Sequence, residues 1–177
     1  MHLTGYVGLL FSLLAFLSLA GFAGVAAWNR RESVLPFIEK GQIIAAGGVL
    51  FSTALLMIGL TSRDYSFKYV YDNVDNALSF IYTLTALWGG REGSLLFWEV
   101  IIAVSGMIFV ATPGYKSLAT DTKLFFWMFF LAVQGFFLFL LTGWSNPFIE
   151  IIPAPHDGRG LNPLLRNPRM IFHPPLL

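Results

Sequence analysis

Long apolar runs alternate with short polar stretches along the chain, and four of these runs are long enough to cross a membrane. An apolar helix of about 20 residues spans a hydrocarbon core of about 30 Å. A further run at residues 78–88 is too short to cross, and it predicts an interfacial or re-entrant helix. The pattern therefore predicts an all-α integral membrane protein with about four transmembrane helices, at residues 5–28, 43–60, 95–112 and 124–141.

The polar stretches divide the chain into regions. Residues 1–145 form the four-span region, which includes an aromatic and glycine-rich segment at 61–94, and residues 146–177 form a polar tail. Lysine and arginine are denser in the links 29–42 and 113–123 than elsewhere, although their raw counts do not favour those links. Because positive loops stay in the cytoplasm, we expect the N-terminus, the segment 61–94 and the tail to lie in the periplasm.

The segment 61–94 begins with aromatic residues in alternation. Tyr65, Phe67, Tyr69 and Tyr71 occupy every second position, which predicts an extended segment with one ring-lined face. Such a face fits two interpretations. It is either an aromatic belt at the level of the lipid headgroups or a platform for a ligand.

A glycine-rich turn precedes the third predicted span. Ser94 is a candidate N-cap for the helix that follows. The turn also places Trp88, Arg91 and Glu92 at the membrane surface, beside backbone that can approach a ligand closely. The turn is therefore either a candidate binding site or simply the start of a helix.

Glu99 lies inside the third predicted span. A carboxylate at that depth is costly, so it is treated as a functional hypothesis by default. The alternatives are that Glu99 stays near the interface or pairs with a cation.

Composition supports the membrane assignment and excludes several functions. Of the 177 residues, 56% are hydrophobic and 12% charged, against about a quarter charged in soluble proteins. The net charge of +1 provides no basic stripe for nucleic acid. The chain has no cysteine, which excludes disulfides and thiolate chemistry of its own.

The tail carries one candidate metal ligand, His173. Neutral imidazole is a strong ligand for iron, and Pro174 and Pro175 restrict the backbone on which His173 is presented. The same prolines are also typical of a helix start, and both interpretations can hold together.

The combined motifs resemble a known family. The stretch TALWGGREGSLLFWEV, the motif SNPF and the tail DGRGLNPLLRNPRMIFHPPLL are similar to the N-terminal portion of CcmF-type cytochrome c biogenesis proteins. That family includes the haem lyase subunits for nitrite reductase maturation. The resemblance covers essentially the whole chain, in the same order.

The resemblance implies a haem-handling subunit of the inner (cytoplasmic) membrane. Such a protein receives haem from a periplasmic haem chaperone and helps to attach it to apocytochrome c, together with a thiol-handling subunit. The histidine of HPPLL, here His173, is expected to be an axial haem ligand. On physical grounds we add that Arg159, Arg166 and Arg169 could pair with haem propionates.

The sequence also departs from the family pattern. It lacks the tryptophan-rich WWD segment, the second periplasmic histidine and the membrane-embedded histidines, so we expect a complementary CcmF half or a truncated reading frame. Arg91 replaces a histidine common in the family, and Glu99 stands where an apolar residue is usual. The competing hypothesis is a small ion-translocating subunit that uses Glu92 and Glu99, or a purely structural membrane subunit without haem.

Overall fold

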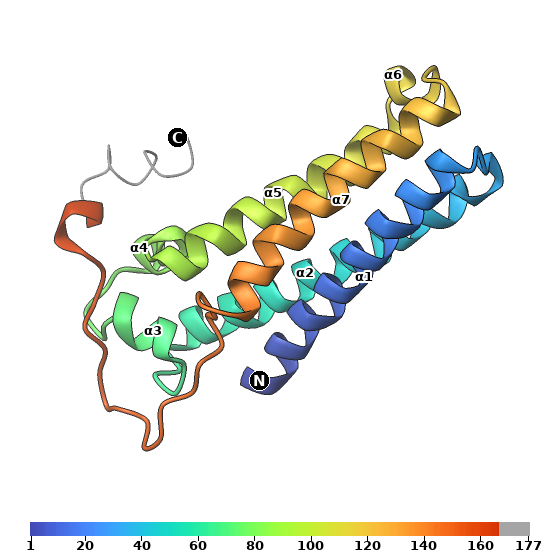
Figure 1. The fold of residues 1–177 in the computed structure, drawn as a ribbon. Coiled ribbons are helices and arrows are strands. Elements are labelled where there is room, and N and C mark those ends of the chain that lie inside the picture. Colours follow the sequence, from blue (N-terminus) through green and yellow to red (C-terminus); the bar gives the residue numbers. More distant parts are fainter. Residues whose placement is uncertain (167–177) are drawn as a thin grey trace.

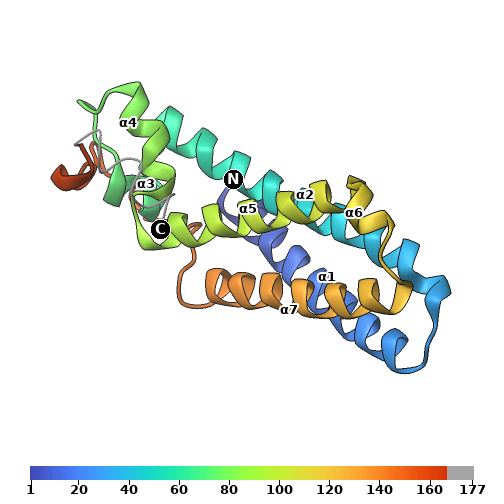
Figure 2. The same ribbon diagram turned by 90° about the horizontal axis from the view of Figure 1, so that it is seen from above.

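Four long helices lie side by side in a bundle, as Figure 1 and Figure 2 show. The computed structural model describes residues 1–166. The long helices are α1 (His2–Trp28), α2 (Leu35–Ser62), α5 (Arg91–Ala111) and α7 (Thr120–Thr142). Short elements join them: η1 (Glu32–Val34), α3 (Lys68–Asn73), α4 (Phe80–Thr85), η2 (Ala86–Trp88), α6 (Pro113–Lys116) and η3 (Pro163–Arg166).

The bundle confirms the predicted fold class. Each of the four long helices is long and apolar enough to cross a membrane, and the described residues form no strand beyond one isolated bridge. The helices extend past the apolar runs that identified them. The second helix begins at Leu35, inside the predicted polar link 29–42, because Pro36 occupies its first turn, where proline is favourable.

Small residues let the helices approach closely. Ser12 on α1 donates from its hydroxyl to the Ala45 carbonyl on α2 at 2.8 Å, and Ser52 on α2 donates to the Gly5 carbonyl at 2.9 Å. Where α1 meets α7, a Cβ added at Gly135 would lie 2.4 Å from Leu17. Close packing of backbones through small residues is the usual way in which helices associate in membranes.

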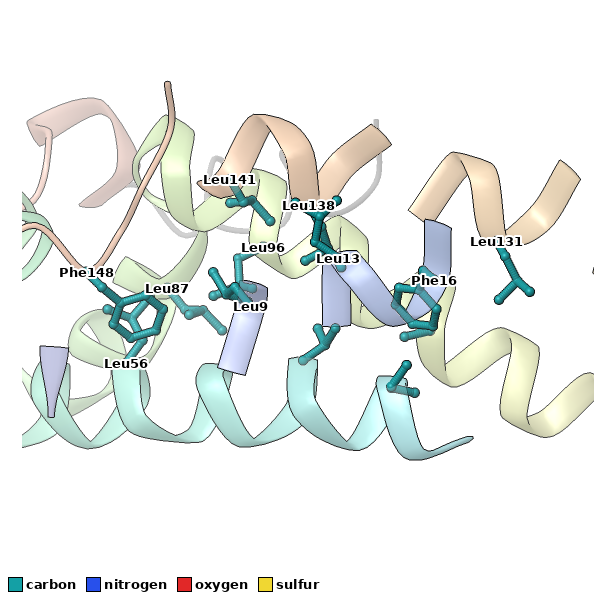
Figure 3. Close-up of a cluster of buried hydrophobic side chains, with 14 of the residues drawn as sticks. Leu9, Leu13, Phe16, Leu56, Leu87, Leu96, Leu131, Leu138, Leu141 and Phe148 are labelled. Carbon is teal, nitrogen blue, oxygen red and sulfur yellow. The ribbon is translucent and has the colours of Figure 1, made fainter. Parts of the chain in front are cut away.

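The centre of the bundle is a largely apolar core. Figure 3 shows leucine and phenylalanine side chains from all four long helices pointing toward one another. Leu9, Phe16, Leu56, Leu96 and Leu138 are completely buried within it. This core fixes the position of the bundle end from which the connecting segments extend.

Residues 63–90, here called the connector, join α2 to α5 at one end of the bundle. The prediction of an extended segment with alternating rings is wrong for most of its length, because Lys68–Asn73 form the helix α3. Only Phe67 pairs in a bridge, with Glu150, and the chain then turns into α3. The helix buries both Tyr69 and Val70, which a strand would have pointed to opposite sides. As expected from its length, the run 78–88 forms short helices and not a span.

The predicted N-cap at Ser94 is also wrong. Helix α5 begins one turn earlier, at Arg91, and Gly90 is its N-cap residue. The Ser94 hydroxyl donates instead to the Trp88 carbonyl at 2.8 Å, and so fastens the connector to α5.

Candidate functional site

The described part of the polar tail, residues 146–166, lies across the connector. These residues run beside α3 and α4 in Figure 1. The backbone N–H of Lys68 donates to the Ile149 carbonyl at 2.8 Å, and that of Ile151 donates to the Ser66 carbonyl at 2.7 Å. Further along, the Arg159 N–H donates to the Tyr71 carbonyl at 2.7 Å. The two segments therefore form one polar layer at the end of the bundle.

Two arginines of the tail pair with carboxylates of the connector. Arg159 contacts Asp72 at 3.3 Å, and its guanidinium lies over the Tyr71 ring, 5.3 Å from the centroid. Arg166 contacts Asp75 at 2.8 Å. Both arginines were predicted to bind haem propionates. In this structure a propionate would have to displace or share an aspartate partner.

Gly160 permits the second of these pairs to form. Its φ is +82°, in the left-handed region that favours glycine. A Cβ at this position would lie 2.1 Å from an Asp75 carboxylate oxygen. The glycine therefore lets the tail backbone pass directly over the carboxylate that Arg166 binds.

Asp157 makes a third tie between the tail and the connector. Its carboxylate accepts a hydrogen bond from the backbone N–H of Asn76 at 2.8 Å. This bond, followed by a second one from the N–H of Gly158, lowers the pKa of the Asp157 carboxyl below its ordinary value. The ionised form of Asp157 is thus the form that holds the tail.

A polar cleft of about 350 Å³ opens where the connector, the start of α5 and the tail meet. Its charged lining contains both signs, with Lys68 paired to Asp72 and Arg91 paired to Glu92 at 2.9 Å. The complete lining is Lys68, Tyr69, Asp72, Asn73, Gly90, Arg91, Glu92, Trp144, Asn146 and Ile149.

The structure separates the three residues of the predicted loop site. Arg91 and Glu92 line the cleft, but Trp88 does not. The Trp88 ring packs instead against Phe97 on α5, with 5.1 Å between the ring centroids. Arg91 and Glu92 therefore form part of a polar cleft, whereas Trp88 supports the junction between the connector and α5.

Tyr69 holds the wall of the cleft in place. Its hydroxyl lies 2.8 Å from the Ala86 carbonyl and 2.9 Å from the Leu87 carbonyl, and it accepts a hydrogen bond from the Gly90 N–H at 3.1 Å. Burial raises the pKa of this hydroxyl well above its ordinary value, so Tyr69 stays neutral and continues to donate.

Glu99 lies in the bundle and not at its surface. The side chain is completely buried, and neither carboxylate oxygen has a hydrogen-bond partner among the described residues. Among residues 1–166, no cation pairs with Glu99, which argues against the cation-paired alternative. Leu96, also completely buried, lies between Glu99 and the cleft residue Glu92 on the same face of α5.

The main predicted ligand cannot be placed. His173 and Arg169 lie outside the described residues. Within residues 1–166, no group of three or more His, Cys, Asp or Glu side chains could hold a metal ion. The sequence interpretation missed the partners Asp72 and Asp75 and the cleft residues Lys68 and Trp144. The signal in the sequence was the spacing of two aspartates, Asp72 and Asp75, three residues apart.

Comparisons with known proteins identify the chain's relatives. It is 32% identical to a cytochrome c-type biogenesis protein of Rhodobacter capsulatus over 179 residues, which is 98% of this chain and 26% of the relative. The cytochrome c-type biogenesis protein CcmF of Haemophilus influenzae matches with 32% identity over 98% of this chain and 26% of its own length. The probable biogenesis protein NrfE of Escherichia coli K12 is 35% identical over 90% of this chain and 28% of its own length.

A solved structure shares the fold. The structure of the cytochrome c haem lyase CcmF superposes with a TM-score of 0.75 at 21% identity, over 84% of this chain and 24% of the other. No protein-family model matches the chain. The chain spans about a quarter of the length of the curated relatives it matches. With homologues that cover nearly all of its residues, this multi-pass membrane protein belongs to the family of CcmF-type cytochrome c biogenesis proteins.

Proposed function

We propose that the chain is a haem-handling part of a cytochrome c maturation machinery in the inner membrane, with its tail on the periplasmic side. The observation that carries this proposal is the match of 98% of the chain to cytochrome c-type biogenesis proteins. Haem would be the transferred substrate, delivered by a haem chaperone and attached to apocytochrome c. His173 would ligate the iron on one side.

The polar layer at the end of the bundle supports a role in positioning His173. The tail is fastened to the connector through Arg159 and Arg166 and through backbone hydrogen bonds, and His173 follows Arg166 by seven residues. The second axial ligand would come from outside these 177 residues, from a complementary portion of the machinery. Arg159 and Arg166 would exchange an aspartate for a propionate when haem is present.

The direct test is a haem titration of the purified chain in lipid nanodiscs, alone and with the complementary portion. We expect a haem absorbance band in the presence of that portion, and we expect His173→Ala to abolish it. His156→Ala is the matched control, because His156 is an exposed histidine of the same tail. Equal haem binding by the wild type and His173→Ala would reject the ligand assignment.

Ion translocation is the second candidate function, and the burial of Glu99 inside the membrane bundle favours it. A proton path from the polar cleft to Glu99 is interrupted, however, because the buried side chain of Leu96 lies between Glu92 and Glu99 on α5. Proton flux into liposomes that contain the chain tests this candidate. Flux that is lost in Glu99→Gln would favour it over haem handling.

A further inference from the structure

Three buried polar side chains in the bundle have more hydrogen-bonding atoms than partners. Glu99, Gln42 and Gln134 are each completely buried. Both Glu99 oxygens, both Gln134 amide atoms and the Gln42 oxygen have no hydrogen-bond partner among residues 1–166. Buried polar atoms in folded proteins nearly always have a partner, so this group requires an explanation.

The contacts around these three side chains indicate that they lie at the same level along the bundle axis. Gln42 on α2 donates from its side-chain nitrogen to the Ala103 carbonyl on α5 at 3.1 Å, and Glu99 lies one turn before Ala103. A Cβ added at Gly106 would lie 2.6 Å from Phe130 on α7 and 2.8 Å from the Gln42 side chain. Gln134 follows Phe130 by one turn, so α2, α5 and α7 each contribute one member.

Among the described residues, no buried side chain of opposite charge accompanies Glu99. It is the only acidic or basic side chain among the buried polar residues of the described part. Helix α1 has no Asp, Glu, Lys or Arg, and α7 has only Asp121 and Lys123, both in its first turn. The segment 80–88 that packs at the end of α5 has none either. The nearest charges along the helices that carry the group are Glu39 and Lys40 on α2 and Glu92 on α5.

A lone carboxylate in this position would be far less stable than the neutral acid. Transfer of an isolated ionised carboxylate into an apolar interior is highly unfavourable, and in practice such a group takes up a proton. The neutral acid has one O–H donor and one carbonyl acceptor, which match amide groups and water.

We propose that Glu99, Gln134 and Gln42 form an intramembrane site that holds one proton on the Glu99 carboxyl and about one or two ordered water molecules between the side chains. Each water molecule would satisfy two or more of the five atoms that lack a protein partner. Leu96 separates the site from the polar cleft, so the proton is held and not relayed.

Infrared difference spectroscopy on the full chain in nanodiscs tests this site. At neutral pH, subtraction of the Glu99→Gln spectrum should reveal a protonated carboxyl band in the wild type. That band should shift in Gln134→Leu, because Gln134 shares its hydrogen bonds. A water band that shifts in ¹⁸O-labelled water should disappear with Glu99→Gln.

Glu32→Gln is the control variant, because Glu32 is exposed in the short link between α1 and α2 and its change should leave the protonated band intact. If Glu99→Gln removed the bands of an ionised carboxylate and not the band of a protonated carboxyl, the proposal would be overturned. An unshifted band in Gln134→Leu, a missing water band, or proton flux that depends on Glu99 would each overturn it as well. Should Glu99→Gln fail to fold, titration of the wild-type carboxyl band at rising pH gives the same decision.

Discussion

The bundle and the polar layer of connector and tail are stabilised by different forces. In the bundle, Phe16 and Trp127 are completely buried, and shape complementarity fixes the helices. In the polar layer, Arg159 and Arg166 have side chains that are 69% and 46% exposed, and they hold the tail through ion pairs that water and salt weaken. The helices therefore provide a fixed frame, whereas the tail that precedes His173 can exchange partners at low cost.

The largest expected effect is on the bundle. Trp127→Ala removes a completely buried ring, together with the hydrogen bond from its indole nitrogen to the Tyr115 hydroxyl at 2.7 Å. We expect the free energy of unfolding to fall by about 3 to 5 kcal/mol, measured by denaturation in mixed micelles. Phe129→Ala is the matched control on the same helix, because Phe129 is 66% exposed. Equal losses in the two variants would contradict the packing that we describe.

The next effect concerns the junction between the two regions. Gly93→Ala would place a Cβ 1.9 Å from the Leu87 carbonyl oxygen and 2.1 Å from the Tyr69 hydroxyl. We expect a loss of about 1 to 3 kcal/mol in the free energy of unfolding, since the backbone of η2 has to move. Gly114→Ala meets nothing within 4 Å and serves as the control. If the Gly93→Ala protein were as stable as the control, the close contacts of Gly93 with Leu87 and Tyr69 would be contradicted.

A smaller effect is expected when the tail is released from the connector. Arg166→Gln removes the ion pair with Asp75, and exposed pairs of this kind contribute roughly 0.2 to 1 kcal/mol. We expect faster proteolysis of the tail with little change in the stability of the bundle. At high salt, which weakens the ion pair, the cleavage rate of the wild-type tail should approach that of the variant. Arg31→Gln, at an exposed arginine between α1 and α2, should leave the cleavage rate unchanged.

The smallest effect depends on pH. Because the pKa of Asp157 is lowered in the folded protein, its hydrogen bond to Asn76 contributes fully above the ordinary aspartate pKa of about 4. The contribution is lost as the pH falls through the lowered value. Hydrogen exchange at the Asn76 amide should accelerate in that acidic range. Asp157→Asn should remove most of this pH dependence, and an unchanged pH profile would show that another group is responsible.

The membrane helices could be predicted because each depends on a local property of the sequence. A run of apolar residues at the required length identifies a span wherever it occurs. The helix ends were less accurate, because the polar residues around Leu35 and Arg91 continue their helices beyond the apolar runs. The aromatic alternation in the connector was misinterpreted, because burial of Tyr69 and Val70 required a helical turn.

The polar layer could be predicted only in part. Arg159 and Arg166 were identified as functional candidates, but their partners Asp72 and Asp75 are 87 and 91 residues away along the chain. A pairing over that distance depends on how the tail folds back over α3, which no local pattern reveals. The role of His173 stays a prediction, since it rests on the family resemblance and lies outside the described residues.

The packing of α1 against α7 has a consequence for biosynthesis. These two helices share the most extensive interface of the bundle, and the Tyr6 hydroxyl donates to the Thr142 carbonyl at 3.1 Å. Of the four long helices, α1 is synthesised first, yet it obtains its main neighbour last, after α2 and α5 have been synthesised. Until then its apolar face has only α2 and lipid as neighbours, so the four-helix bundle is completed only when α7 is inserted.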